Sequence, residues 1–208
     1  TRAGSEHNHG GVPIPAGRHF LHIPGPTNVP DRVLRAIDRP TIDHRGPEFA
    51  RLFAEVTDWL KVFFETQQDV ILLTASGTGG MEAAIVNTLS PADRVLAVTT
   101  GAFGDRFAEI AEAHGADVTR LQVPMGQAAD PDKVGVMVRE QGPFAAVLLT
   151  QNETSTGVTN DVQALTESIR SAAGGLTSRS FEKLPRGNAD GGGLVMPLGI
   201  VTVKRISR

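Results

Sequence analysis

The sequence predicts an α/β protein in which helices cover a mostly parallel sheet. Two observations lead to this class. The 208 residues are 40% hydrophobic and 21% charged, which is ordinary for one globular unit, and strand-like runs alternate with helix-like runs. Because two parallel strands need a crossover between them, each helix is expected to return the chain across the sheet. The strand-like runs are 70–74, 94–100, 117–123 and 144–150, and the helical runs are 79–89, 103–114 and 130–140.

The elements before residue 70 are predicted to be an arm and two helices. Residues 1–18 are polar, hold four Gly and two Pro and have no period, which predicts a flexible arm. Its His7 and His9 have no third ligand nearby, so we expect no metal site there. Residues 24–30 are expected to be extended and to precede a short helix. From Pro47 the apolar side chains recur at helical spacing, which predicts a long amphipathic helix packed on the core. These side chains are Phe49, Leu52, Phe53, Val56, Leu60 and Phe63.

The predicted body of the protein covers residues 19–175. The stretch GDRFAEIAEAHGADV (104–118) is typical of a helix that ends at a glycine cap, Gly115, and continues into a strand. A further helix is expected over 161–173. This order of elements completes the α/β pattern of the body.

A change of character follows at residues 176–208. This tail holds six Lys or Arg against two Asp or Glu, whereas the preceding residues hold 14 against 21. Three consecutive glycines at 191–193 exclude a long helix, and only GIVTV (199–203) resembles a strand. We therefore expect an atypical C-terminal tail, produced by a truncation, a frameshift or an alternative C-terminus.

Composition also excludes several classes of function. The formal net charge is −3, and the body lacks the clustered Lys and Arg that bind a phosphate backbone, so nucleic acid is not an expected partner. The chain has no Cys, which excludes disulfides and thiolate chemistry and fits a reducing compartment. It has neither an apolar run of 18 residues nor a signal peptide. We expect no membrane association and a cytoplasmic location.

The candidate binding motif is the glycine-rich turn ASGTGG (75–80), which precedes a predicted helix. Small residues allow backbone N–H groups to approach an anion, and the positive end of the helix dipole favours phosphate. A nucleoside triphosphate loop would need Gly-Lys-Ser/Thr where the chain has Gly80-Met81-Glu82. A dinucleotide fingerprint would need a third glycine where Glu82 stands, and this alternative stays open. A tight turn without a ligand is the structural alternative.

A phosphorylated heteroaromatic ligand would fit the residues that follow the predicted strands. Ser76, Thr78 and the N–H groups of 77–79 suit a monophosphate. Phe103 lies just after a strand, where its ring can stack on a flat ligand. Thr154 lies after the 144–150 strand, at the edge where α/β sheets bind ligands. Together these features describe a pocket for pyridoxal 5′-phosphate.

Three ordered motifs then resemble one family. HFLHIPGPTNVPDRVLRAIDRPTIDHRGPEF, ASGTGGMEAAIVNTLSP and QNETSTGVT resemble the class V, fold-type I pyridoxal-phosphate aminotransferases, most closely the serine–glyoxylate and alanine–glyoxylate group, over about residues 18–174. The resemblance implies the N-terminal half of a three-layer large domain, incomplete here. It also implies a homodimer, with an amino acid and a 2-oxo acid as substrates.

The resemblance assigns roles to individual residues. It makes Ser76, Gly77 and Thr78 the phosphate-binding turn, Phe103 the stacking ring and Thr154 the hydroxyl that bonds the cofactor ring. It implies amino transfer from serine or alanine to glyoxylate.

The family's lysine motif and its ring-nitrogen carboxylate are not found in this sequence. Lys204 lies 50 residues after Thr154, about the expected distance, but its neighbours do not match, so it is only a weak candidate for the covalent lysine. We therefore expect this chain alone to be inactive. Two alternatives stay open: a non-catalytic remnant that binds a phosphorylated ligand and pairs with a full-length subunit, and a dinucleotide-binding protein.

Overall fold

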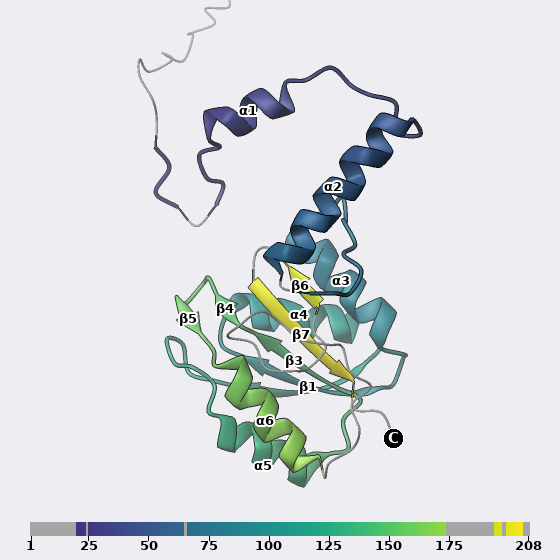
Figure 1. Ribbon diagram of the computed structural model, residues 1–208. Coiled ribbons are helices and arrows are strands. Elements are labelled where there is room, and N and C mark those ends of the chain that lie inside the picture. Colours follow the sequence, from purple (N-terminus) through teal and green to yellow (C-terminus); the bar gives the residue numbers. More distant parts are fainter. Residues whose placement is uncertain (1–19, 24, 65, 174–193, 197–198, 206–208) are drawn as a thin grey trace, which may run out of the picture. The chain divides into compact units, whose positions relative to one another are not determined.

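The computed structural model describes residues 20–23, 25–64, 66–173, 194–196 and 199–205 (Figure 1). The chain divides into two compact units, residues 1–41 and 42–208. The first unit contains the short predicted helix, α1 (Asp31–Ile37), which follows Pro30 and carries Asp31 in its first turn. The predicted arm over 1–18 lies outside the described residues.

The second unit alternates helices and strands as the sequence pattern predicts. In chain order it contains α2 (Pro47–Phe63), α3 (Gly77–Thr88), β1 (Arg94–Thr99), α4 (Ala102–Ala113), β2 (Asp117–Gln122), α5 (Pro131–Gln141), β3 (Ala146–Thr150), β4 (Asn152–Glu153), β5 (Val158–Thr159), α6 (Val162–Ala172), β6 (Leu194–Met196) and β7 (Gly199–Arg205). Among the described residues, no helix combines the length and the apolar character needed to cross a bilayer.

The main sheet has the strand order β2-β1-β3-β7-β6. Strand β1 pairs in parallel with both β2 and β3, because α4 and α5 carry the chain back between successive strands. Strand β7 joins the other side of β3 in antiparallel orientation, with Thr150 opposite Val201. The GIVTV segment of the tail is thus part of a strand, as predicted, and it extends the parallel sheet by an antiparallel hairpin.

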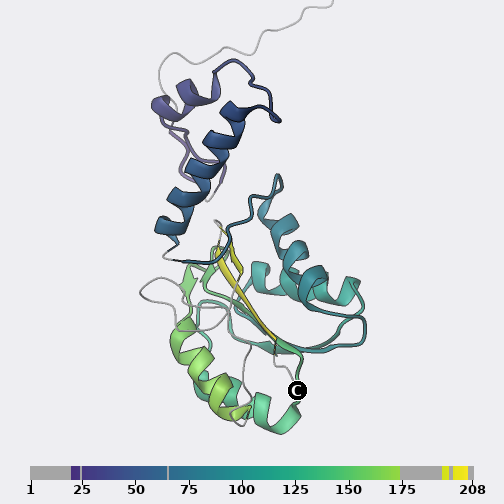
Figure 2. The same cartoon turned by 45° about the vertical axis from the view of Figure 1, so that its right-hand side comes forward.

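Helices cover both faces of this sheet (Figures 1 and 2). Side chains of α3 and α4 pack on one face, around Ile85, Phe107 and Leu148. Side chains of α5 and α6 pack on the other face, around Val134, Leu165 and Leu149. The α/β class and the helix-covered parallel sheet are therefore confirmed.

Local signals explain where these elements begin and end. The Asp130 and Asp161 side chains accept hydrogen bonds from the first-turn N–H groups of α5 and α6, and each replaces one missing intrahelical acceptor. Gly115 has a φ of 85° after α4, where a residue with a Cβ would be strained. The chain then turns directly into β2.

Two predictions about the N-terminal elements are wrong. Residues 70–74 form no strand, and Ile71 is 77% exposed. A segment of β-branched and apolar residues becomes a strand only when it pairs with another strand. Residues 70–74 cannot pair with the side of β3 away from β1, because β7 pairs there. Helix α2 forms as expected, but it has no buried residue, so its apolar stripe does not pack on the described core.

Candidate functional site

The glycine-rich turn forms the N-terminus of α3. Ser76 is its N-cap, with an extended backbone, and makes no side-chain hydrogen bond to the helix. Within the described part of the chain, the N–H groups of 77–79 therefore have no hydrogen-bond acceptor. A Cβ on Gly79 would lie 2.8 Å from that of Ala75, so this turn needs glycine. The structure leaves an open set of donors at the positive end of α3.

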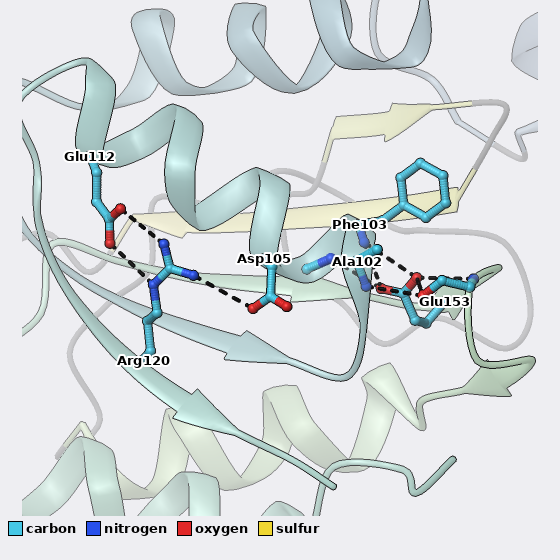
Figure 3. A network of polar contacts seen from close by, with 8 residues as sticks. Ala102, Phe103, Asp105, Glu112, Arg120 and Glu153 are labelled. Atoms are coloured by element: carbon cyan, nitrogen blue, oxygen red, sulfur yellow. Dashed lines mark hydrogen bonds and ion pairs between the residues drawn. The ribbon is translucent and has the colours of Figure 1, made fainter. Parts of the chain in front are cut away.

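The N-terminus of α4, by contrast, is capped by a distant carboxylate. Glu153 of β4 is 1% exposed, and its Oε2 accepts hydrogen bonds from the N–H groups of Phe103 at 3.1 Å and Gly104 at 3.0 Å (Figure 3). Its Oε1 accepts from Ser155 N at 3.2 Å and Ser155 Oγ at 2.6 Å. The negative charge thus lies at the positive end of the helix dipole, where it is stabilised.

The same cluster fixes the turn before α4. The Ser155 hydroxyl accepts a hydrogen bond from Ala102 N at 3.0 Å. A Cβ on Gly101 would lie 2.6 Å from Glu153 Cγ and 2.5 Å from Ser155 Oγ. Only glycine leaves room for the carboxylate, so Gly101, Glu153 and Ser155 form one packed unit.

Arg106 connects the glycine turn with the aromatic ring. It lies one helical turn after Phe103 on α4, and its guanidinium carbon is 5.6 Å from the centre of the Phe103 ring. Its Nη1 lies 3.5 Å from Thr78 Oγ1 on α3. One side chain therefore spans the distance between the turn and the ring.

Thr154 lies between the two residues that brace α4. It is exposed, and in the described part of the chain its hydroxyl has no hydrogen-bond partner. Nearby, the buried Thr150 Oγ1 and Gln151 Oε1 atoms have no hydrogen-bond partner among the residues that the structure describes. Asn160, 4% exposed, ties the ends of β1 and β3 together by donating to Thr100 Oγ1 and to the Thr150 carbonyl. The carboxyl ends of these parallel strands thus carry several unused polar groups.

The structure brings the predicted residues to one region. Arg106 links Thr78 to Phe103, and Glu153 links the backbone of Phe103 to the segment that carries Thr154. Lys204 lies on β7 opposite Val147, three residues before the carboxyl end of β3. Its side chain lies outside what the structure describes, so its role is untested.

Sequence reasoning missed Arg106, and it missed that Glu153 at the end of the 144–150 strand caps α4. Arg106 follows Phe103 by three residues, a spacing that puts both on one helix face, and this signal was available. The cap that Glu153 forms joins residues 49 and 50 positions apart, and no local pattern contains such a contact.

A second polar network lies on α4 away from this region (Figure 3). Arg120 of β2 donates to both carboxylate oxygens of Glu112, at 3.1 and 2.9 Å, and lies 3.5 Å from Asp105. The hydrogen bond with Glu112 raises the pKa of the Arg120 guanidinium, which stays charged. This network joins α4 to β2.

The described residues fit pyridoxal phosphate. The N–H groups at the start of α3 and the Thr154 hydroxyl have no hydrogen-bond partner among the described residues, so they can bond a phosphate and a ring substituent. The half-buried Phe103 offers a ring face. The α4 N-terminus does not compete for the phosphate, because Glu153 already satisfies it. Among the described side chains, no lysine is hydrogen-bonded or ion-paired with these residues.

Comparisons with known proteins give consistent matches. Residues 19–177 match the family model described as aminotransferase class-V. A soluble hydrogenase small subunit of Synechococcus is 42% identical over 153 residues, 73% of this chain and 40% of the relative. The L-aspartate–glyoxylate aminotransferase of Paracoccus denitrificans is 41% identical over 155 residues, 73% of this chain and 39% of the relative. The serine–glyoxylate aminotransferase of Methylorubrum extorquens is 39% identical over 159 residues, 75% and 40% of the two chains.

A solved structure agrees with these sequence matches. The aspartate aminotransferase of subgroup IV from Thermus thermophilus superposes with a TM-score of 0.67 and 36% identity, over 72% of this chain and 41% of that one. The chain spans about two fifths of the length of the curated relatives it matches.

Proposed function

Because the chain belongs to the class-V aminotransferase family, we propose that it forms the cofactor-binding part of a pyridoxal-phosphate-dependent aminotransferase that uses glyoxylate as amino acceptor. The names of two relatives include glyoxylate, and one of them includes serine. We propose serine or alanine as the amino donor. When bound, the cofactor would act as an electron sink and would carry the amino group from one substrate to the other.

Each residue of the site has a distinct part in this proposal. Ser76, Gly77 and Thr78 hold the phosphate through hydroxyls and N–H groups at the positive end of α3. Phe103 packs against the face of the cofactor ring and excludes water from it. Thr154 bonds a polar substituent of the ring and fixes its rotation.

The observation that carries the proposal is the pair of contacts made by Arg106, to Thr78 at 3.5 Å and to the Phe103 ring at 5.6 Å. A pyridoxal phosphate molecule must touch a phosphate site and a ring site at once. These contacts bring the two candidate sites within the span of one arginine side chain. A structural glycine turn without a ligand gives no reason for that proximity.

Equilibrium dialysis with pyridoxal phosphate and, separately, with NAD tests the proposal. We expect the chain to bind pyridoxal phosphate, and Thr78→Ala and Phe103→Ala to weaken this binding about tenfold or more. Thr88→Ala is the matched control, because Thr88 bonds a carbonyl at the other end of α3. Binding of NAD with no affinity for pyridoxal phosphate would refute the proposal and support the dinucleotide alternative.

Borohydride reduction followed by peptide mapping tests the covalent lysine. An adduct on Lys204 would identify it as the residue that holds the cofactor. Binding without any lysyl adduct would instead support the non-catalytic remnant, which pairs with a full-length subunit.

We also propose that the protein forms a homodimer, as the family resemblance implies. Helix α2 supports this, since it exposes a row of large apolar side chains that a partner would cover. These are Leu52, Phe53, Val56, Trp59, Val62 and Phe63. Sedimentation velocity should detect a dimer that Val62→Glu weakens, while Val136→Glu on the exposed surface of α5 leaves it intact. A monomer at all concentrations would contradict the proposal.

A further inference from the structure

Arg106 of α4 places a positive charge beside the glycine turn. Among the side chains that the structure describes, no carboxylate is ion-paired with its guanidinium. The other arginine packed against α4, Arg120, has both Glu112 and Asp105 as partners. The contrast matters because Asp105 is the sequence neighbour of Arg106 but is engaged elsewhere. Within the described part of the chain, a guanidinium that makes no ion pair therefore lies at the glycine turn.

The glycine turn itself carries no cation. Residues 75–80 read Ala-Ser-Gly-Thr-Gly-Gly, so a phosphate bound there meets only hydroxyls, N–H groups and the helix dipole, which is equivalent to about half a charge. A phosphate monoester carries up to two negative charges at neutral pH. The turn alone leaves most of that charge uncompensated.

We propose that Arg106 binds the phosphate of the cofactor and so completes the anion site that the α3 turn begins. This inference rests on the proposed function and adds a binding residue to it. The Nη1 atom is within 3.5 Å of Thr78 Oγ1, at the limit of a hydrogen bond. No described residue accepts a hydrogen bond from the other guanidinium donors, so they are available for phosphate oxygens. The planar fork suits bidentate contact with phosphate, which a lysine in its place would not reproduce.

Contact with the Phe103 ring gives Arg106 a fixed direction. The guanidinium carbon lies 5.6 Å from the ring centre, within the range of a cation–π contact. Because Glu153 holds the backbone of Phe103, the ring is a rigid support for the arginine. An exposed side chain is thereby directed toward the turn and loses less conformational entropy on binding.

A purely structural role for Arg106 makes a different prediction. If Arg106 only joined Thr78 to Phe103, its loss would weaken binding of every ligand that touches the ring or the turn. If it binds the phosphate, its loss would weaken only ligands that carry one. Pyridoxal, which has the ring without the phosphate, separates the two roles.

The experiment measures the affinity of the full chain for pyridoxal phosphate and for pyridoxal by equilibrium dialysis, with circular dichroism to verify folding. Arg106→Gln is expected to weaken pyridoxal phosphate binding about 10- to 100-fold and to change pyridoxal binding less than about twofold. The affinity of Arg106→Lys for pyridoxal phosphate should lie between those of the unaltered chain and Arg106→Gln, because lysine keeps the charge but lacks the planar, bidentate guanidinium. Arg139→Gln, at an exposed position of α5, makes the same change of net charge and should alter neither affinity.

The outcomes separate the two proposals. Equal affinity of the unaltered chain and Arg106→Gln for pyridoxal phosphate would overturn the role of Arg106 and leave the proposed function standing. An equal loss for both ligands would also overturn it, in favour of the structural role. No binding of pyridoxal phosphate by the unaltered chain would overturn the proposed function and this inference with it.

Discussion

The cap that Glu153 places on α4 predicts a large loss of stability when its carboxylate is changed. The carboxylate accepts from the N–H groups of Phe103, Gly104 and Ser155 and from the Ser155 hydroxyl. In Glu153→Gln one oxygen can keep the Phe103 and Gly104 bonds, but the NH2 group then faces Ser155 N–H, and two donors meet. The charge that strengthens the remaining bonds is also lost.

The size of the effect follows from these bonds. Glu153→Gln loses one hydrogen bond, and two others are no longer strengthened by the charge of the carboxylate. It also avoids the cost of burying that charge. The net fall in the free energy of unfolding is therefore about 2 kcal/mol. Glu153→Ala removes the acceptor of the N–H groups of Phe103, Gly104 and Ser155 and opens a cavity, which together lower the free energy of unfolding by about 4 kcal/mol. For a chain of this length each kcal/mol lowers the Tm by about 2–4 °C.

Urea denaturation followed by circular dichroism measures both losses. Glu109→Gln is the matched control, since it makes the same substitution on the exposed surface of α4 and should stay within about 0.5 kcal/mol of the unaltered protein. Amide exchange at Phe103 and Gly104 should accelerate in both Glu153 variants. If Glu153→Ala were no less stable than Glu109→Gln, the carboxylate would not be what holds the α4 N-terminus.

Three further perturbations test the same region and its surroundings. Gly101→Ala should lower the free energy of unfolding by about 2 kcal/mol, because the new Cβ overlaps Glu153 Cγ. In a double-mutant cycle this loss should be smaller in the Glu153→Ala background, and full additivity would contradict the overlap. Asn160→Ala should lower the free energy of unfolding in urea by about 3 kcal/mol, because it breaks three buried hydrogen bonds. A fall of less than about 1 kcal/mol would mean that other groups replace these bonds. Arg120→Gln should lower the free energy of unfolding by less than about 1 kcal/mol, because its carboxylate partners are more than a third exposed. High salt should remove this difference from the unaltered protein, and a loss that does not depend on salt would contradict an ion-pair origin.

The body of the fold was predictable because its signals are local. The alternation from residue 94 to 173 gives β1, α4, β2, α5, β3 and α6 within a few residues of the expected bounds, and Gly115 marks the turn between α4 and β2. These boundaries depend on caps and hydrophobic periods, which neighbouring residues determine. Sequence reasoning therefore succeeded wherever an element and its cause lie within about ten residues.

The errors concern features that depend on distant partners. The run 70–74 has strand composition but no strand to pair with among the described residues, and the antiparallel β7 lies beside β3 instead. In the same way, the apolar stripe of α2 predicts a covered face, and that face is exposed in the described structure. Composition and period therefore indicate whether a segment favours a helix or a strand, whereas contacts with distant segments decide whether the strand pairs and whether the apolar face is buried.

In the candidate site, too, local sequence patterns predicted the residues but not the contacts between distant segments. Hydroxyls, glycines and an aromatic residue after predicted strands were visible in the sequence as Ser76, Thr78, Phe103 and Thr154. Their proximity depends on contacts of Arg106 and Glu153 that join segments 28 and about 50 residues apart, which no spacing rule contains. Whether the predicted residues bind a cofactor stays a prediction.

The two helix N-termini at this edge of the sheet differ in a way that bears on what the site can bind. Both have the positive end of a helix dipole, but at α4 the buried carboxylate of Glu153 already accepts hydrogen bonds from the first N–H groups. A second anion there would meet an existing negative charge and no free donor. At α3 no described residue accepts a hydrogen bond from the N–H groups of 77–79, and the Arg106 guanidinium lies 3.5 Å from Thr78 Oγ1 in the same turn. The carboxylate that stabilises α4 therefore leaves the glycine turn as the better of these two helix ends for an anion, which agrees with the proposed place of the cofactor phosphate.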